Sequence, residues 1–227
     1  MTNILKTKEK GTLIVLSGPS GCGKASVVER LREYNDNFWV SISCTSRKPR
    51  IGEEDGITYY FISEEEFKEK IDNDELIEYN YYNGNYYGTP KGHIEMYLKE
   101  GTDVILEVDV NGALAIKHKL PEAIFIFLMP PSMKELVRRL KKRGTESIDK
   151  ILSRFKDAYK EINEVTKYNY VVVNDELDTA ARKVNSIIEA QKCSVDRIEE
   201  VFLNNPEEEI HELLIDDKEF ENIDMKI

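Results

Sequence analysis

The feature that most constrains this chain is a glycine-rich segment placed between a short apolar run and a helical pattern. Residues 12–17 (TLIVLS) are typical of a fully buried strand, and GPSGCGKAS follows at 18–26. The spacing of apolar residues after this segment predicts a helix over 24–34. A strand, a glycine turn and a helix in this order open an α/β fold with a parallel sheet.

The glycine-rich segment has the composition of a phosphate-binding loop. Its glycines allow backbone N–H groups to converge on phosphate oxygens, and the helix N-terminus adds a partial positive charge. Lys24 supplies a full charge for the outer phosphates of a nucleotide. The alternative is a tight turn with an ordinary helix cap. The predicted nucleotide contacts are Gly18, Pro19, Ser20, Gly21, Cys22, Gly23, Lys24, Ala25 and Ser26.

Position 25 departs from this pattern, because the residue after the lysine is usually Ser or Thr, whose hydroxyl meets Mg²⁺. Ala25 has no hydroxyl, and Ser26 points about 100° away around the helix. Either phosphates, water and acids hold the metal, or catalysis is weakened. Glu107 and Asp109 lie at the end of an apolar run and face one side of the predicted strand. We expect them to contact Mg²⁺ through water.

Other segments supply the rest of an α/β core. Buried parallel strands are predicted at 104–108, 123–129 and 170–173. Helices are predicted at 91–99, 111–119, 132–142 and 178–192. Ser132 with Glu135 indicates a capping box, and Asp178 is the expected N-cap of the last helix. After that helix, Val195, Ile198 and Phe202 have helical spacing.

Residues 41–89 have a different character. Half-exposed strands are predicted at 57–62 and 77–81, with a short helix capped by Ser63 and Glu66 between them. Seven of the 12 tyrosines of the chain fall in this stretch. The pattern predicts a small mixed lobe inserted into the parallel-sheet core.

Clustered arginines are the other candidates for phosphate chemistry. Arg139 and Arg143 precede Gly144, and Arg154 follows one helix later. Cations beside a glycine hinge suit a lid that closes over a transferring phosphoryl group, although a basic solvent-exposed face would have the same composition. In the lobe, Arg47 and Arg50 can bind a phosphate bidentately.

Composition limits the class of protein. The 227 residues carry a net charge of −11, and residues 192–227 contain 12 acids and four bases, so the main body is near neutral. We therefore expect no nucleic-acid partner. No apolar run could span a bilayer, the N-terminus lacks a signal-peptide core, and three distant cysteines argue against disulfides. These features favour a cytoplasmic protein without membrane partners, and a homo-oligomer is compatible with them.

Taken together, residues 11–190 resemble the guanylate kinases. The matching segments are GPSGCGK (18–24), TSRKPRIGEEDGITYYF (45–61), ELIEY (75–79), GNYYGTP (84–90), ILEVDVNGA (105–113), FIFLMPPS (125–132), RLKKRGTES (139–147), Arg154 and VVND (172–175). The acidic tail extends beyond the usual end of this family.

The resemblance implies a role for each matching residue. The GMP phosphate would be held by Arg47, Arg50, Tyr59 and Tyr87. Glu78 would accept the N1 and N2 protons of guanine, Ser43 and Thr89 would contact its O6 side, and Asp109 would line the guanosine and metal region. The transferring phosphoryl group would be stabilised by the catalytic residues Lys24, Arg139, Arg143 and Arg154. Asn174 and Asp175 would lie by the adenine of ATP.

The expected fold is a P-loop three-layer α/β/α core with a parallel sheet, an inserted GMP-binding lobe and a helical lid. We expect the core at 11–42, 90–138 and 158–190, the lobe at 43–89, the lid at 139–157 and an acidic extension at 193–227. The expected function is Mg²⁺-assisted, in-line phosphorylation of GMP, and of dGMP, by ATP. The alternatives are a non-catalytic guanylate-kinase-like interaction module and a kinase for another phosphorylated acceptor, such as a ribose bisphosphate.

Overall fold

The computed structural model describes residues 5–82, 84–142 and 148–201. The chain divides into two compact units. One unit is residues 9–191, and the other consists of the terminal segments 1–8 and 192–227. Among the described residues, every helix is too short or too polar to span a lipid bilayer.

The larger unit is built on a five-stranded sheet whose strands all run parallel. In spatial order the strands are β10 (Tyr170–Val173), β9 (Ile124–Met129), β2 (Leu13–Ser17), β8 (Asp103–Glu107) and β3 (Phe38–Val40). The predicted strands at 12–17, 104–108, 123–129 and 170–173 are confirmed. The strand β3 was not predicted, since three residues leave too little pattern to recognise.

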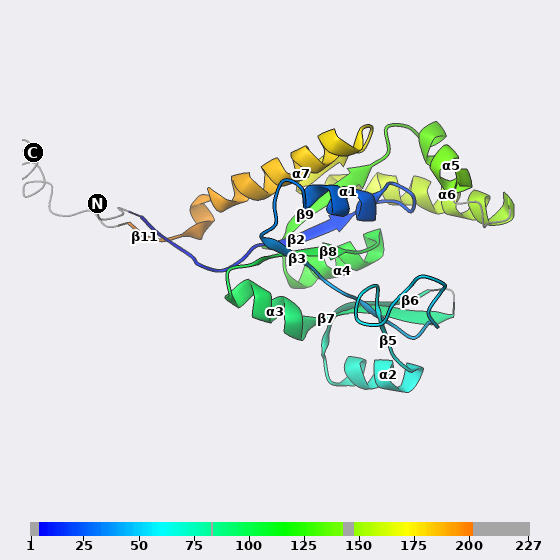
Figure 1. Cartoon of the computed structure of the whole chain (residues 1–227), viewed down its shortest axis with the longest axis horizontal. Coiled ribbons are helices and arrows are strands. Elements are labelled where there is room, and N and C mark those ends of the chain that lie inside the picture. Colours follow the sequence, from blue (N-terminus) through cyan, green and yellow to red (C-terminus); the bar gives the residue numbers. More distant parts are fainter. Residues whose placement is uncertain (1–4, 83, 143–147, 202–227) are drawn as a thin grey trace, which may run out of the picture. The chain divides into compact units, whose positions relative to one another are not determined.

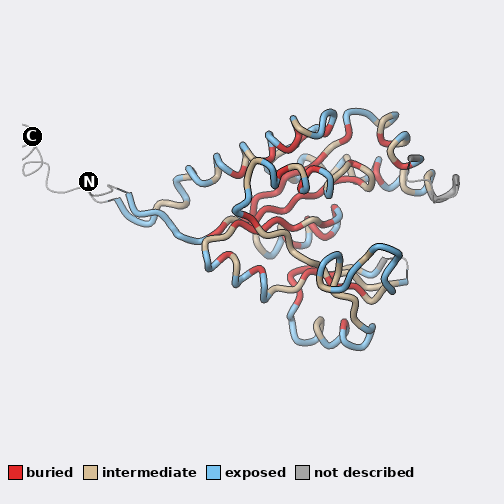
Figure 2. Tube along the Cα trace, viewed as in Figure 1, coloured by how far each residue is buried: buried red, intermediate tan, exposed pale blue. Residues whose placement is uncertain are grey.

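Helices cover both faces of this sheet, which confirms the three-layer arrangement (Figure 1). On one face lie α1 (Lys24–Leu31) and α7 (Leu177–Lys192), and on the other lie α3 (Lys91–Lys99) and α4 (Val110–Lys119). Successive residues of β2 alternate between the two faces, so Ile14 and Leu16 pack in one apolar cluster and Leu13 and Val15 in the other. The buried residues follow the central strands in Figure 2.

Two further helices, α5 (Met133–Lys142) and α6 (Ile148–Ile162), follow β9, and the 3₁₀ turn Asn163–Lys167 leads into β10. Leu136 and Leu140 of α5 pack with Ala158 of α6. The last helix begins at Leu177, so Asp178 lies in its first turn rather than at the N-cap. The Asp178 carboxylate instead accepts hydrogen bonds from Arg30, Tyr34 and Arg182, because α1 packs beside α7.

The inserted lobe has its own mixed sheet, in the order β5 (Tyr60–Phe61), β4 (Cys44–Thr45), β7 (Asn85–Pro90) and β6 (Leu76–Tyr82). The helix α2 (Glu64–Asp72) covers it and has the predicted capping box of Ser63 and Glu66. Phe67 of α2 packs with Cys44 and Leu76. The strand predicted at 57–62 is much shorter, because residues 56–58 form a turn.

In the smaller unit, β1 (Leu5–Thr7) pairs antiparallel with β11 (Ile198–Val201). The short 3₁₀ turn Val195–Arg197 precedes β11. A helix indicated by the spacing of Val195, Ile198 and Phe202 is therefore wrong at Ile198, which lies in a strand and pairs with Thr7. Phe202 lies outside the described residues.

Candidate functional site

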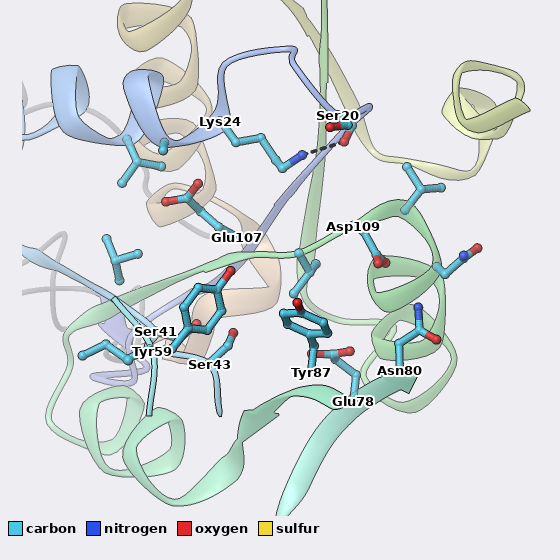
Figure 3. A pocket seen from close by; sticks show the side chains of 18 of the residues that line it. Ser20, Lys24, Ser41, Ser43, Tyr59, Glu78, Asn80, Tyr87, Glu107 and Asp109 are labelled. Atoms are coloured by element: carbon cyan, nitrogen blue, oxygen red, sulfur yellow. Dashed lines mark hydrogen bonds between the residues drawn. The ribbon is translucent and has the colours of Figure 1, made fainter. Parts of the chain in front are cut away.

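Most of the predicted site residues line one cavity of ≈ 1420 Å³ in the larger unit (Figure 3). It lies between the glycine-rich loop, the ends of the central strands, the inserted lobe and α6. The predicted residues in its wall are Gly18, Ser20, Lys24, Ala25, Ser43, Arg50, Tyr59, Glu78, Tyr87, Glu107, Asp109 and Arg154.

A second cavity of ≈ 370 Å³ contains another group of predicted residues, namely Gly21, Gly23, Ser26, Arg139, Asn174 and Asp175. Arg139 is thus at a different cavity from Lys24 and Arg154, although the sequence analysis grouped the three as catalytic residues. The cause is tertiary packing, since α5 directs Arg139 toward the segment after β10. Pro19, Cys22, Arg47 and Thr89 line neither cavity, and Arg143 lies outside the described residues.

The glycine-rich loop has the backbone that a phosphate-binding loop requires. Gly18 and Gly23 have φ values of +146° and +96°, where a side chain is strained. A Cβ at Gly18 would lie 2.1 Å from the carbonyl oxygen of Leu128, and one at Gly23 would lie 2.6 Å from Nδ2 of Asn174. The Lys24 ammonium donates to the Gly18 carbonyl at 2.7 Å, which holds its charge over the loop.

The lobe contributes a buried carboxylate to the first cavity. Glu78 is only 7% exposed, and its Oε1 accepts a hydrogen bond from the Thr89 hydroxyl at 2.7 Å. The Ser43 hydroxyl lies 3.4 Å from that of Thr89. Burial raises the pKa of Glu78 to about 7, and the charge of Asp109 adds to this effect, while Thr89 and Lys119 oppose it. This carboxyl therefore titrates near neutral pH.

A second cluster in the lobe surrounds Arg47. Both of its terminal nitrogens bind the Glu53 carboxylate, each at 2.9 Å, and its guanidinium lies 5.7 Å from the ring of Tyr59. The rings of Tyr59 and Tyr87 are 6.2 Å apart. The ion pair with Arg47 lowers the pKa of Glu53. Glu53 was not predicted from the sequence, where its only signal is its position within the segment 45–61.

The strand-end acids Glu107 and Asp109, expected to contact Mg²⁺ through water, both line the first cavity. Burial raises the pKa of Glu107, and the Lys24 charge opposes this shift. Asp109 caps α4 by accepting the N–H of Gly112 at 2.7 Å. No group of three or more potential metal ligands occurs among the described residues. The donor set suits a cation that arrives with phosphates and water, because Mg²⁺ is commonly bound through one or two carboxylates plus substrate phosphates.

Three acids of α6 and the turn after it also line the first cavity, and none of them was predicted from the sequence. They are Asp157, Glu161 and Glu164. Burial raises the pKa of Glu161, while the charge of Lys24 lowers it. Their spacing from Arg154, at three, seven and ten residues, places them on one helical face and was the available signal.

Profile and pairwise comparisons agree with this geometry. The family model described as "Guanylate kinase" matches residues 10–191. The guanylate kinase of Clostridium tetani is 54% identical over 208 residues, covering 92% of this chain and all of that protein. That of Clostridium perfringens strain 13 is 50% identical over 216 residues, covering 95% of this chain and all of that protein.

A solved structure supports the same assignment. The crystal structure of guanylate kinase from Anaplasma phagocytophilum is 30% identical to this chain and superposes with a TM-score of 0.71. The match covers 93% of this chain and 98% of that one. The cavity, the loop and the sequence relatives therefore lead to one conclusion: the chain belongs to the guanylate kinase family.

Proposed function

We infer that the enzyme, which phosphorylates GMP with ATP, brings GMP and the outer phosphates of ATP together in the first cavity, and that it also accepts dGMP. One observation supports this assignment of the two nucleotides. Lys24 of the glycine-rich loop and Glu78 of the lobe both lie in the wall of the same cavity. One residue offers a cation for phosphates, and the other offers a buried acceptor for a base. A phosphoryl group can pass directly between two nucleotides held in this way.

On the acceptor side, Glu78 reads guanine. An ionised carboxylate accepts two adjacent N–H donors, which guanine presents at N1 and N2 and adenine does not. Thr89 and Ser43 sit beside Glu78 with hydroxyls that suit the O6 side of the base. Asp109 lines the guanosine region.

The GMP phosphate binds to arginine and tyrosine side chains of the lobe, all of which line the first cavity except Arg47, whose guanidinium lies against the ring of Tyr59. Two N–H groups of Arg47 bind Glu53 and one binds the Lys48 carbonyl, so its guanidinium has further donors for Tyr87 and for a phosphate. The other ligands are Arg50, Tyr59 and Tyr87. Ionised arginine is the donor that best matches the oxygens of a phosphate.

On the donor side, the loop holds the phosphates of ATP. The loop ligands are Gly18, Pro19, Ser20, Gly21, Cys22, Gly23, Lys24, Ala25 and Ser26. Asn174, Asp175 and Arg139 line the second cavity and suit the adenine end of the nucleotide. Lys24 and Arg154 face the first cavity and stabilise the transferring group, and Arg143 is proposed to join them.

The reaction needs no protein nucleophile. A GMP phosphate oxygen attacks the γ-phosphorus in line, the bond from that phosphorus to the β–γ bridging oxygen breaks, and ADP leaves. Positioning and neutralisation of charge supply the catalysis. Mg²⁺ supplies charge neutralisation on the phosphates of ATP, with Glu107 and Asp109 available to its waters.

We propose that the segment 139–157, of which residues 143–147 lie outside the described residues, acts as a lid, and that 43–89 is the acceptor lobe. They join a core of 11–42, 90–138 and 158–190. Closure of both would exclude water from the first cavity and favour transfer to GMP over hydrolysis of ATP. We also propose 193–227 as an acidic C-terminal extension, on the basis of its charge.

A coupled assay of ADP formation tests this account. We expect turnover with GMP, slower turnover with dGMP, and little with AMP, UMP or a ribose bisphosphate. Glu78→Gln should reduce the preference for GMP over AMP, because an amide offers only one acceptor oxygen and adds a donor. Equal rates with GMP and AMP in the unaltered enzyme would contradict the proposed role of Glu78. Calorimetric binding of GMP without any turnover would favour an interaction module.

A further inference from the structure

Glu135 of α5 lies outside both cavities, yet it is tied to the ATP side of the enzyme. Its Oε1 accepts a hydrogen bond from Nε of Arg139 at 2.8 Å. The same carboxylate also binds Arg138 through two contacts of 2.7 Å. The Glu135 and Arg139 side chains are 21% and 22% exposed, whereas Arg138 is 66% exposed. Arg139 is therefore the partner that links Glu135 to the interior.

Arg139 joins three segments that are distant in the sequence. Its Nη2 donates to the carbonyl oxygen of Asn174 at 2.9 Å, and its Nη1 donates to the carbonyl oxygen of Cys22 at 3.3 Å. The Asn174 amide also donates to the Cys22 carbonyl, at 2.8 Å. The glycine-rich loop, the segment after β10 and α5 are thus connected through one guanidinium.

These contacts determine the orientation of a peptide group in the loop. In a trans peptide the C=O of one residue and the N–H of the next point in nearly opposite directions. Two donors hold the Cys22 carbonyl, so they also set the direction of the Gly23 N–H, which points away from them. That N–H is a candidate donor to a phosphate of ATP. Its orientation depends on Arg139, and Arg139 depends on Glu135.

We propose that Glu135 is a positioning residue for ATP, which acts by holding Arg139 across the loop and the Asn174 segment. The proposal rests on the assignment of ATP to the loop. It concerns the Glu135 side chain alone, because the helix cap uses the backbone: the Glu135 N–H donates to Oγ of Ser132 at 3.1 Å. The two arginines lower the pKa of Glu135 to about 2, so it stays ionised at the pH of any assay.

The test compares Glu135→Gln with Arg138→Gln, which also removes a partner of Glu135 but leaves Arg139 and the loop intact. Calorimetry measures the binding of ATP and of GMP separately, and steady-state kinetics give KM and kcat. We expect Glu135→Gln to weaken ATP binding about tenfold, as expected for the loss of a charge-assisted hydrogen bond. GMP affinity should stay within about twofold, KM for ATP should change more than kcat, and Arg138→Gln should bind both nucleotides within about twofold of the unaltered enzyme.

A double variant shows whether Glu135 acts through Arg139. Glu135→Gln in an Arg139→Gln background should cause no further loss of ATP affinity, since the link is already broken. Equal losses in both backgrounds would overturn the proposal, as would unchanged ATP affinity in Glu135→Gln. Failure of the unaltered enzyme to bind ATP would instead refute the ATP site itself. Should Glu135→Gln not fold, Glu135→Asp keeps the charge but not the reach, and a loss confined to ATP of about threefold is expected.

Discussion

The Thr89 hydroxyl donates a hydrogen bond of 2.7 Å to the Glu78 carboxylate, which is buried in the wall of the first cavity. The two residues face each other on adjacent antiparallel strands, β6 and β7. The hydroxyl favours the ionised form of Glu78, but burial favours the neutral form more strongly, so the pKa rises to about 7. Because Glu78 is the proposed acceptor for guanine and titrates near neutral pH, GMP binding should depend on pH.

The first prediction concerns stability. The pKa of Glu78 is about 7 in the folded protein and 4.5 ordinarily, so the folded state binds the proton more tightly than the unfolded chain. Glu78 therefore contributes stability that is fully present below pH 4.5 and is lost as the pH rises through 7. We expect a loss of about 3 kcal/mol from this residue over that window. Urea unfolding at several pH values measures it, and Glu78→Gln should remove this component. An identical pH dependence in that variant would contradict the shifted pKa.

The second prediction concerns proton release. At pH 6 the free enzyme holds Glu78 mainly protonated, because its pKa is about 7. Guanine needs the ionised carboxylate as an acceptor, so GMP binding should release a proton at pH 6 and almost none at pH 8.5. Calorimetry in buffers with different ionisation enthalpies measures the number of protons released on binding, as the slope of the binding enthalpy against the ionisation enthalpy of the buffer. No difference between buffers at pH 6 would count against the pairing of Glu78 with guanine, and Glu78→Gln is the control.

The third prediction concerns the acceptor phosphate. Arg47→Ala removes a charged donor and leaves Glu53, whose negative charge would then repel the GMP phosphate. We expect KM for GMP to rise at least about tenfold and kcat to fall, with KM for ATP nearly unchanged. Lys48→Ala is the matched control, since Lys48 is exposed and contacts Arg47 only through its backbone carbonyl. Full activity in Arg47→Ala would exclude Arg47 from the site.

The fourth prediction concerns Mg²⁺. Ala25 lines the first cavity with Lys24, whereas Ser26 lines the second. A hydroxyl at position 25 would therefore lie on the side of the transferring phosphate, and the hydroxyl of Ser26 does not replace it. We expect Ala25→Ser to lower the Mg²⁺ concentration for half-maximal rate several-fold, and Ser26→Ala to leave it unchanged. The rates of both variants are measured over a range of Mg²⁺ concentrations. If the concentration for half-maximal rate does not change in Ala25→Ser, the missing hydroxyl has no consequence.

The fifth prediction concerns the thiols. Cys22 and Cys44 are buried and Cys193 is exposed. Burial raises the pKa of Cys22, and it raises that of Cys44 to about 11, so little reactive thiolate forms at neutral pH. N-ethylmaleimide should label Cys193 first and leave activity intact. Mass spectrometry locates the label, Cys193→Ser should lose it, and rapid inactivation with label on Cys22 would contradict the burial of that thiol.

Features that depend only on neighbours in the chain could be predicted from the residues alone. The loop at 18–26 needs only its glycines and Lys24 between a strand and a helix. The cap of α2 needs only Ser63 and Glu66, three residues apart, and the structure confirms it. The alternation within β2 follows from the two-residue repeat of a strand. The resemblance to a family then connected such local segments to one fold and one activity.

Contacts between side chains that are distant in the sequence depend on how the elements pack, and they could not be predicted. Glu135 had the spacing of a capping box, but its carboxylate binds Arg138 and Arg139, which lie three and four residues along the same helix and compete with the cap. Arg139 in turn lies at the second cavity, because the segment after β10 runs beside it. Local spacing carries no information about a partner 35 residues away along the chain, as Asn174 is from Arg139. The raised pKa of Glu78 could not be predicted from the sequence either, because it depends on burial by elements that are distant in the chain.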